Sequence, residues 1–377
     1  MLDPLIQLNL WKQLALPASK QLLDDAKAIN PSDVAAISRL RKKYDADLLH
    51  LALDMVKARH KAASKWPVDI VQNLIANTTG IEQATSLLVS KHKAKRFVDL
   101  GQPVIDICCG IGGDALGLKQ CGVQVTGVDI DPVHAWMTTH NANCPTQVID
   151  ANDVKIDRGS VFHIDPSRRN AYGRTQDISD YQPGPDVLKR LLAQQPTACF
   201  KLGPGVNLDC LKEEITGDIP NEIEIISEHG HLVQAVLWTG ELAKCARRAT
   251  LLPQGLEFAA HEDDVWEEPP LDEIGKYVMT FDPSVERLGL IALLCQKLDV
   301  SCVHPQAGLL TSDQITDSPW VHNFQVLADL PWRPKKLKAE LRKQNAGIVE
   351  IKTRGKLVNP DPLQKQLRGK GDQLLTV

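Results

Sequence analysis

Carboxylates and glycines gather in one short stretch, residues 103–132, where they could bind a charged ligand. The members with useful chemistry are Asp106, Cys108, Gly110, Gly112, Asp114, Asp129 and Ile130. Glycines let a backbone turn approach a ligand closely. A carboxylate at the end of the next apolar run is placed to accept hydrogen bonds from ribose hydroxyls. The spacing therefore predicts a nucleoside-binding strand, turn, helix and strand.

Two ligand classes fit such a turn. Gly110-x-Gly112-x-x-Ala115 also satisfies the dinucleotide fingerprint. A dinucleotide would place its pyrophosphate at the helix N-terminus, where anions are favoured, but Asp106 and Asp114 put negative charge on both sides of the turn. S-adenosylmethionine has a ribose and an adenine, lacks phosphate, and carries an ammonium and a sulfonium. We therefore expect S-adenosylmethionine, and the weaker alternative for Asp114 is an ordinary first-turn helix charge.

Several motifs support this expectation from outside the glycine turn. They are DICCGIGGDALGL (106–118), VTGVDIDP (125–132) and HIDPSRR (163–169). As a set they resemble the motifs of class I S-adenosylmethionine-dependent methyltransferases. The likeness is greatest to a bacterial subgroup with a C-terminal THUMP-like domain, through GIEQAT (80–85), KHKAKRF (91–97), VEIKTRG (349–355) and LRGKGD (367–372). DICCGIGG followed by DIDP is also similar to the trimethylguanosine synthase branch, which supports a nucleic-acid substrate by analogy alone.

The motif at 165–169 resembles the [D/N]-P-P-[Y/F] motif of methyltransferases that act on exocyclic or ring-conjugated amines. The resemblance implies that Asp165 and a backbone carbonyl orient the amine, so that positioning supplies most of the rate. The candidate catalytic residues are Asp165, Pro166, Ser167, Arg168 and Arg169. Ser167 and Arg168 depart from the motif, and a guanidinium can stack on a base or clamp a phosphate. The alternative is that Asp165 merely caps a turn before Pro166.

The adenine contact is left open between three neighbouring side chains. The resemblance places an acid or amide after the third strand, where Asp153 is the candidate and Asp150 and Asn152 compete with it. Asp165 is also counted among the cofactor-binding residues. Cys108 and Cys109 are predicted to be small core residues, because nothing else marks a cysteine mechanism.

Charge is distributed unevenly along the 377 residues. The net charge is −4, yet residues 57–96 hold eight Lys or Arg against two Asp or Glu, and residues 331–377 hold twelve against four. Such basic regions can bind an anionic partner, and RNA is the expected one. Its candidate contacts are Lys61, Lys336, Arg342 and Arg354. Solvated basic helices are the alternative.

Other classes are disfavoured by composition. No run of eighteen apolar residues exists, and the start of the chain lacks the flanks of a signal peptide. Nine cysteines without a C-x-x-C pair favour reduced thiols over disulfides or a zinc site. We expect a cytoplasmic protein without a metal or a membrane association.

The elements that position these residues follow from periodicity. Apolar runs predict seven strands, at 103–108, 123–128, 146–149, 160–165, 197–202, 222–228 and 232–238, and the last two form a hairpin. Helices between the early strands predict an α/β fold with a doubly wound, seven-stranded Rossmann-like sheet. Apolar steps of three and four predict one helix of about thirty residues beginning near Asp33, and a further hairpin is predicted from 247 to 258.

Length and composition predict several domains. We expect a helical N-terminal domain at 1–95, the methyltransferase domain at 96–260, an acidic linker with a connecting helix at 261–299, and a small α+β THUMP-like domain at 300–377. In the last domain, Lys352, Arg354 and Lys356 are predicted to alternate along a strand. The sequence thus predicts a methyltransferase acting on a nitrogen of an RNA base, with a small-molecule methyltransferase or a non-catalytic RNA-binding protein as alternatives.

Overall fold

The structure, a computed structural model, describes most of the chain and divides it into two compact units. The described residues are 3–30, 32–170, 173–264, 268–304, 307–354 and 358–377. The two units are Met1–His261 and Glu262–Val377. Among the described residues, no helix is long and apolar enough to cross a membrane.

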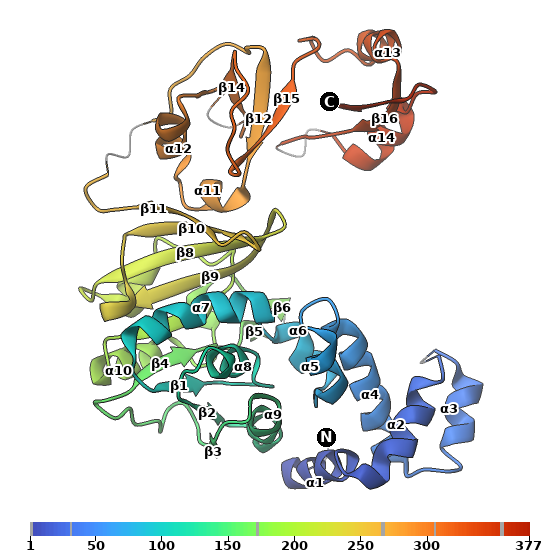
Figure 1. The fold of residues 1–377 in the computed structure, drawn as a ribbon, viewed down its shortest axis with the longest axis vertical. Helices are drawn as coiled ribbons and strands as arrows, with labels where there is room; N and C mark the ends of the chain where they lie inside the picture. Colours follow the sequence, from blue (N-terminus) through green and yellow to red (C-terminus); the bar gives the residue numbers. More distant parts are fainter. Residues whose placement is uncertain (1–2, 31, 171–172, 265–267, 305–306, 355–357) are drawn as a thin grey trace. The chain divides into compact units, whose positions relative to one another are not determined.

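A nine-stranded sheet forms the framework of the first unit, in the order β11-β10-β8-β9-β7-β4-β1-β2-β3 (Figure 1). Its strands are β1 (Val104–Ile107), β2 (Val125–Asp129), β3 (Thr146–Val148), β4 (Val161–Ile164), β7 (Ala198–Leu202), β8 (Asn221–Glu228), β9 (His231–Thr239), β10 (Arg247–Leu252) and β11 (Leu256–Ala260). All seven predicted strands are present. The prediction of a seven-stranded sheet was wrong, because the hairpin of β10 and β11 joins the same sheet through β8.

Parallel pairing makes this a doubly wound sheet, as predicted. β1 pairs in parallel with both β2 and β4, and β4 pairs in parallel with β7. The connecting helices are α8 (Gly113–Gln120), α9 (Pro132–Ala142) and α10 (Pro185–Gln194). Because crossovers are right-handed and the strand order reverses at β1, α10 lies on the opposite face from α8 and α9. Ligands bind beyond the carboxyl ends of the strands at such a reversal.

The N-terminal helices share their core with the sheet. They are α1 (Pro4–Leu14), α2 (Lys20–Lys27), α3 (Val34–Leu40), α4 (Ala46–Ala62), α5 (Val68–Asn73), α6 (Thr78–Gln83) and α7 (Leu87–Leu100). One apolar cluster runs from Trp11 through the α4 helix to Val104 and Trp238. The predicted boundary between residues 95 and 96 therefore falls inside α7 and inside one continuous core.

The prediction of one long helix from Asp33 was wrong. The chain breaks after α3, and α4 begins anew because the Asp45 carboxylate accepts hydrogen bonds from the backbone N–H groups of Asp47 and Leu48. This N-cap satisfies donors that a new helix leaves free. The apolar periodicity continues across the break, so the pattern alone did not reveal it.

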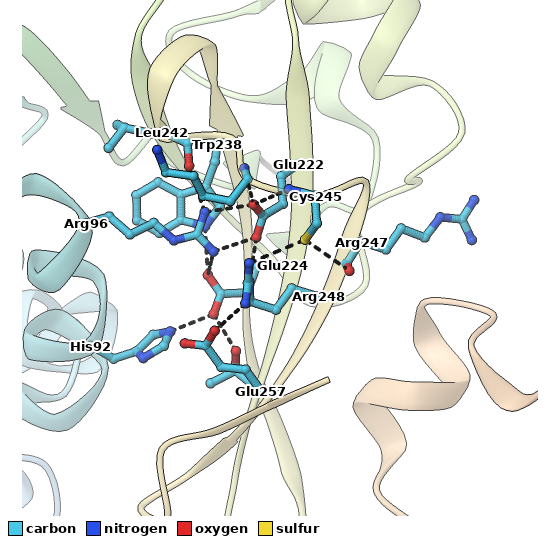
Figure 2. A network of polar contacts seen from close by, with 12 residues as sticks. His92, Arg96, Glu222, Glu224, Trp238, Leu242, Cys245, Arg247, Arg248 and Glu257 are labelled. Carbon is cyan, nitrogen blue, oxygen red and sulfur yellow. Dashed lines mark hydrogen bonds and ion pairs between the residues drawn. The ribbon is translucent and has the colours of Figure 1, made fainter. Parts of the chain in front are cut away.

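A buried polar network fixes α7 against β8, β9 and β10 (Figure 2). The Glu222 carboxylate accepts hydrogen bonds from Arg96 Nη1 and Nη2 at 2.9 and 2.5 Å and from Arg248 Nε at 2.8 Å. Glu224 lies 2.6 Å from His92 Nε2 and accepts the indole N–H of Trp238 at 2.7 Å. Arg96 thus holds the helix to the sheet.

Two small sheets form the second unit. The first, in the order β13-β14-β12-β15, is made of β12 (Tyr277–Phe281), β13 (Ser301–Cys302), β14 (Leu310–Ser312) and β15 (Val321–Gln325), with α11 (Pro283–Arg287) and α12 (Ile291–Leu298). Because β12 pairs with both β14 and β15, residues on both sides of position 300 belong to one sheet. The predicted linker at 261–299 therefore contains a central strand.

The second sheet of this unit pairs β16 (Ala346–Glu350) in parallel with β17 (Gln373–Thr376), with α13 (Pro334–Lys343) and α14 (Pro360–Leu367) packed against it. Asn359 caps the N-terminus of α14, because its side-chain oxygen accepts a hydrogen bond from the backbone N–H of Asp361. The predicted strand through 352–356 was wrong: β16 ends at Glu350, and Lys356 lies outside the described residues.

Candidate active site

A cavity of about 370 Å³ lies at the carboxyl ends of β1 and β4, where the strand order reverses. Its size is within the usual range for small-molecule sites. The wall is built from Gly80, Glu82, Gln83, Ala84, Thr85, Asp106, Cys108, Cys109, Gly110, Ile111, Gly113, Asp114, Asp129, Ile130, His134, Asp165, Pro166, Ser167, Arg168, Gln182 and Lys201. Most of the predicted site residues are therefore brought together.

The glycine turn folds as its composition predicts. Gly110 and Gly112 have φ of +55° and +87°, values that side chains rarely allow. A Cβ on Gly112 would lie 3.1 Å from the Cα of Thr138, so this residue must also be small. Gly112 does not itself line the cavity; it shapes the turn that presents Gly110.

Asp129 holds this turn in place from the end of β2. One carboxylate oxygen accepts the backbone N–H of Gly110 at 2.8 Å, and the other accepts the N–H of Asp131 at 2.9 Å. Burial raises the pKa of Asp129 despite the counteracting His134 and these N–H groups. Each carboxylate oxygen has a second lone pair, so both can still accept a hydrogen bond from a ligand.

Asp106 belongs to a buried network that the sequence did not reveal. Its Oδ1 lies 2.7 Å from Nδ1 of His163, the residue opposite it on β4. Nε2 of His163 lies 3.0 Å from Nζ of Lys93 on α7. The second oxygen of Asp106, Oδ2, is buried and makes no hydrogen bond within the described chain. Burial raises the pKa of Asp106 although His163 lies beside Oδ1 and acts to lower it, and among the described residues no lysine or arginine forms an ion pair with this carboxylate.

Asp114 has such a partner. Its Oδ1 lies 2.6 Å from Nζ of Lys93, which is 2 % exposed, and its Oδ2 accepts the hydroxyl of Thr85 at 2.6 Å. Burial by itself would raise the pKa of Asp114, but Lys93, His163 and Lys201 together outweigh burial and lower this pKa well below its usual value. The expected unpaired negative charge at the start of α8 is therefore neutralised by a lysine from α7.

Asp165 is also paired, at the end of β4. Its Oδ2 accepts a hydrogen bond from Lys201 Nζ at 2.5 Å. The same ammonium donates a second hydrogen bond to the backbone carbonyl of Gln83 at 3.0 Å. Lys201 is the penultimate residue of β7 and is 7 % exposed. The signal that could have identified it is a single lysine in the otherwise apolar strand Ala-Cys-Phe-Lys-Leu, just before Gly203.

The segment at 80–85 closes one side of the cavity and is fixed from the N-terminal helices. Lys65 donates to the backbone carbonyls of Ile81 and Ala84 at 2.8 and 2.9 Å, and the indole of Trp66 donates to that of Thr85 at 3.0 Å. Side chains thus satisfy carbonyls at the end of α6 and in the short segment that leads to α7. The GIEQAT motif marked this segment in the sequence without showing its function.

The remaining predicted residues differ in their position. Ser167 and Arg168 line the cavity, and a Cβ on Gly203 would collide with the Arg168 guanidinium, so the 202–205 loop helps to shape the site. Arg169 begins the short hairpin of β5 (Arg169–Asn170) and β6 (Gly173–Arg174), but its side chain lies outside the described residues. Asp153 and Asn152 are exposed, Asp150 is half-buried, and none of the three lines the cavity.

The cysteines in the wall are not thiolates. Burial raises the pKa of Cys108 and Cys109 well above the usual thiol value, and nearby carboxylates raise it further. The cavity therefore offers no cysteine nucleophile. Within the described part of the chain, no group of three or more His, Cys, Asp or Glu is arranged to hold a metal ion.

The predicted RNA contacts are distributed between the two units. Lys61 pairs with Glu82, a cavity residue. Lys336 and Arg342 are exposed on α13. Arg354 does not join them on a strand: it pairs with both carboxylate oxygens of Glu286.

A groove of about 510 Å³ in the second unit collects other cations. Lys338, Arg342, Arg368 and Lys370 line it, together with the backbone of 369–371. A Cβ on Gly369 or Gly371 would collide with the carbonyl of Ala346 or Asn345. The RGKG sequence thus lets two backbones pack closely and places its arginine and lysine at the groove.

Comparison with known proteins identifies the family. Two uncharacterised S-adenosylmethionine-dependent methyltransferases of Mycobacterium tuberculosis, from strains H37Rv and CDC 1551, are each 32% identical over 331 residues, which is 85% of this chain and 89% of theirs. The chain belongs to the S-adenosylmethionine-dependent methyltransferases. A crystal structure assigned as a methyltransferase from Porphyromonas gingivalis W83 shares the fold, with a TM-score of 0.67, 18% identity and coverage of 92% of this chain and 95% of that one.

Two family profiles match parts of this methyltransferase. RNA cap guanine-N2 methyltransferase matches residues 101–183, and THUMP domain-like matches residues 321–377. The first contains the glycine turn and the Asp165 motif, and the second contains the basic groove. The methyl donor of the enzyme is S-adenosylmethionine.

The cavity fits this cofactor on its own chemistry. Among the described residues, none donates a hydrogen bond to the buried Asp106 Oδ2, so this oxygen can accept one from a cationic ligand. In the part of the chain that the structure describes, neither Asp129 nor Asp106 forms an ion pair with a lysine or arginine, so the turn holds little positive charge for a pyrophosphate. The enzyme's own residues therefore favour a ligand with an ammonium and a ribose over a dinucleotide.

Proposed function

We propose that this enzyme methylates a nitrogen of an RNA base. The observation that carries the proposal is the pairing, in one cavity, of the glycine turn with Asp165 and Arg168. S-adenosylmethionine supplies an electrophilic methyl group on a sulfonium. The RNA cap guanine-N2 methyltransferase profile covers the same residues, which supports an RNA base as the acceptor.

The cofactor residues have distinct parts in this proposal. Asp106 Oδ2 accepts the ammonium, Gly110 lets the backbone approach, and Asp129 accepts from the ribose hydroxyls. Ile130 is 64 % exposed beside the cavity and packs against the adenine. Cys108 lines the turn, and Asp114 acts indirectly by holding Lys93. Asp153 has no part, because it does not line the cavity.

Asp165 orients the acceptor nitrogen. Its carboxylate accepts a hydrogen bond from the amine and directs the lone pair of nitrogen toward the methyl carbon. The nitrogen–carbon bond forms as the carbon–sulfur bond breaks, the electron pair of that bond stays on sulfur, and one amine proton passes to Asp165 and then to water. A near-attack geometry can supply several kcal/mol, so no strong base is needed. Arg168 packs on the base or its phosphate.

The second unit binds the RNA in this proposal. Lys338, Arg342, Arg368 and Lys370 share one groove, Lys336 lies on the same helix, and the THUMP domain-like profile covers them. Four cations in one groove can neutralise several phosphates and release their counterions. Arg354 is excluded, since Glu286 already holds it.

Methyl transfer from tritiated S-adenosylmethionine tests the proposed reaction. RNA, protein and metabolites from a host that lacks the gene are offered to the pure enzyme. Label in RNA, retained after nuclease digestion on one modified nucleoside, is the expected result. Label confined to metabolites would identify a small-molecule methyltransferase instead. Asp165→Ala should cut turnover at least tenfold while leaving cofactor affinity within about twofold.

Charge reversal tests the groove. Arg342→Glu with Lys370→Glu should weaken RNA binding at least tenfold and reduce its salt dependence, by about 0.7 to 0.9 in log-log slope per lost phosphate contact. The control is Lys119→Glu with Lys189→Glu, which makes the same change of charge at exposed positions of the first unit. Equal loss in both variants would mean that only net charge matters, and the groove proposal would be wrong.

A further inference from the structure

Lys201 has an unusual position for a lysine. It extends from the end of a strand whose residues are all buried, and removing an ammonium from water costs several kcal/mol unless partners replace the water. Asp165 Oδ2 at 2.5 Å and the carbonyl of Gln83 at 3.0 Å are such partners. Its place in the cavity wall keeps it within reach of whatever binds there.

The contacts of Lys201 leave one hydrogen-bonding position for a ligand. An ammonium has three N–H donors, and the described residues accept two of them. Asp165 likewise uses only Oδ2, because Oδ1 accepts no hydrogen bond from the described chain. The cavity thus presents one charged donor directly beside one charged acceptor.

We propose that Lys201 and Asp165 together recognise an N=C–NH₂ edge of the acceptor base, an inference that rests on the proposed RNA-base methylation. Asp165 accepts from the amine, and Lys201 donates to the neighbouring ring nitrogen. Adenine offers this edge at N6 and N1, cytosine at N4 and N3, and guanine at N2 and N3. Lys201 is then a specificity-determining residue, and the bases are limited to these three edges.

The same pair disfavours the other nitrogens of a base. An amide edge, H–N–C=O, as in guanine N1 or uracil N3, could form both hydrogen bonds. Its nitrogen, however, has to lose a proton before it can attack, and a carboxylate is a weak base for that step. An amino nitrogen attacks first and loses its proton afterwards. An alkyl amine lacks the adjacent acceptor and would leave the third N–H of Lys201 without a partner, which is costly in a buried site.

Mass spectrometry of the methylated nucleoside is the first test. Total RNA from a host lacking the gene is methylated by the full-length enzyme and digested. N6-methyladenosine, N4-methylcytidine or N2-methylguanosine is expected. A product methylated at guanine N1, uracil N3, a ring carbon or the ribose would overturn the edge assignment while leaving RNA methylation in place. Failure to label RNA at all would reject the proposed function and this inference with it.

Lys201→Met then tests the lysine. It should lower kcat/KM at least tenfold with cofactor affinity and Tm close to those of the unaltered enzyme, and Lys201→Arg should recover part of the loss. Lys189→Met, at an exposed position on α10, is the matched control and should leave kcat/KM unchanged. A variant with normal kcat/KM would remove Lys201 from base recognition.

A deaza base separates recognition from simple positioning of Asp165. An RNA substrate is made in which the ring nitrogen beside the methylated amine is replaced by C–H. This replacement should cost the unaltered enzyme at least tenfold in kcat/KM and cost Lys201→Met almost nothing, because the hydrogen bond is already absent. Equal costs in both enzymes would mean that Lys201 only holds Asp165 and Gln83, and the proposed recognition would be wrong.

Discussion

The two faces of α7 hold two buried charge networks that differ in completeness. On one face Arg96 and His92 meet Glu222 and Glu224, and every carboxylate oxygen has at least one donor. On the other, Lys93 contacts Asp114 and His163, His163 contacts Asp106, and Oδ2 of Asp106 has no donor among the described residues. The complete network has no need of a ligand, whereas the incomplete one has a place for a cation.

The pKa directions agree with this difference. Burial acts to raise the pKa of Glu222 and of Glu224, but the arginines lower that of Glu222, and His92 with Arg96 lowers that of Glu224 to about 2. Burial prevails at Asp106, and its pKa is raised. A buried acid without a full set of donors costs stability and is a common feature of functional sites. Burial of a charge alone therefore does not identify a ligand-binding site. A buried carboxylate oxygen without a hydrogen-bond donor does.

The largest expected effect comes from breaking the complete network. Glu222→Gln leaves the guanidinium groups of Arg96 and Arg248 without a counter-charge, and removing one member of a buried ion pair costs about 3 to 5 kcal/mol. Urea unfolding should show this loss, while calorimetry at a temperature where the variant is folded should show unchanged cofactor affinity. The control is Glu241→Gln, at an exposed position. Loss of cofactor affinity in folded Glu222→Gln would show that the networks are not separate.

The pH dependence of stability distinguishes the two networks, because their contributions to stability change with pH in opposite directions. Glu224 has its pKa lowered to about 2, so its contribution is complete above its ordinary value near 4.5 and is lost as the pH falls toward 2. The loss amounts to about 3 kcal/mol. Asp106 has a raised pKa, so its stabilising protonated form is lost as the pH rises through that pKa.

The test is unfolding, between pH 3 and pH 7, of the unaltered enzyme, Glu224→Gln and Asp106→Asn. It measures whether the contribution of each acid to stability rises or falls with pH. Glu224→Gln should flatten the acid side of the stability profile, and Asp106→Asn should be no less stable than the unaltered enzyme at pH 7. A steep acid loss that persists in Glu224→Gln would assign that loss to other groups.

Asp106→Asn should then weaken cofactor binding by about 1.5 to 3 kcal/mol, or roughly ten- to a hundredfold, as expected for a hydrogen bond to a charged group. The reason is that the amide removes the counter-charge of the ammonium while keeping the shape of the side chain. Isothermal titration with S-adenosylhomocysteine measures this effect. Asp99→Asn, on the exposed side of α7, should bind normally. Unchanged affinity in Asp106→Asn would place the ammonium elsewhere.

The smallest effect is expected at Cys108, which lines the cavity but belongs to neither network. Its thiol pKa is raised well above the usual value, so it is uncharged at neutral pH. Cys108→Ala should change kcat/KM by no more than about threefold. Alanine also carries a Cβ, so the backbone strain at the φ of 59° is the same in both proteins. Initial rates on labelled RNA measure this. A loss of a hundredfold or more would indicate thiol chemistry.

Sequence reasoning recovered the strands and the glycine turn because both are local. Buried parallel strands read as apolar runs, and Gly110 and Gly112 meet a backbone requirement within the turn itself. The partners of the charges were not local: Lys93 is 21 residues from Asp114, and Glu222 is 126 from Arg96. A cation on a helix has the same appearance in the sequence whether it faces water or a buried acid. Lys93 and Arg96 were therefore counted only among the basic residues of 57–96, which were expected to bind RNA or to be solvated.

Single polar residues inside apolar strands were the available signal. His163 in Val-Phe-His-Ile and Lys201 in Ala-Cys-Phe-Lys-Leu both interrupt a buried run. Burying either one requires a partner, although the sequence does not say which. The register of β1, β4 and β7 supplies the answer, because it places His163 beside Asp106 and Lys201 next to Asp165.

The central claim is that the missing partner of Asp106 is the cofactor ammonium. A crystal structure of the enzyme with S-adenosylhomocysteine tests it most directly. We expect the cofactor ammonium to lie within about 3 Å of Asp106 Oδ2 and the contacts of Lys93 and Arg96 to be unchanged. A complex in which the ammonium binds elsewhere and Oδ2 stays without a donor would contradict it.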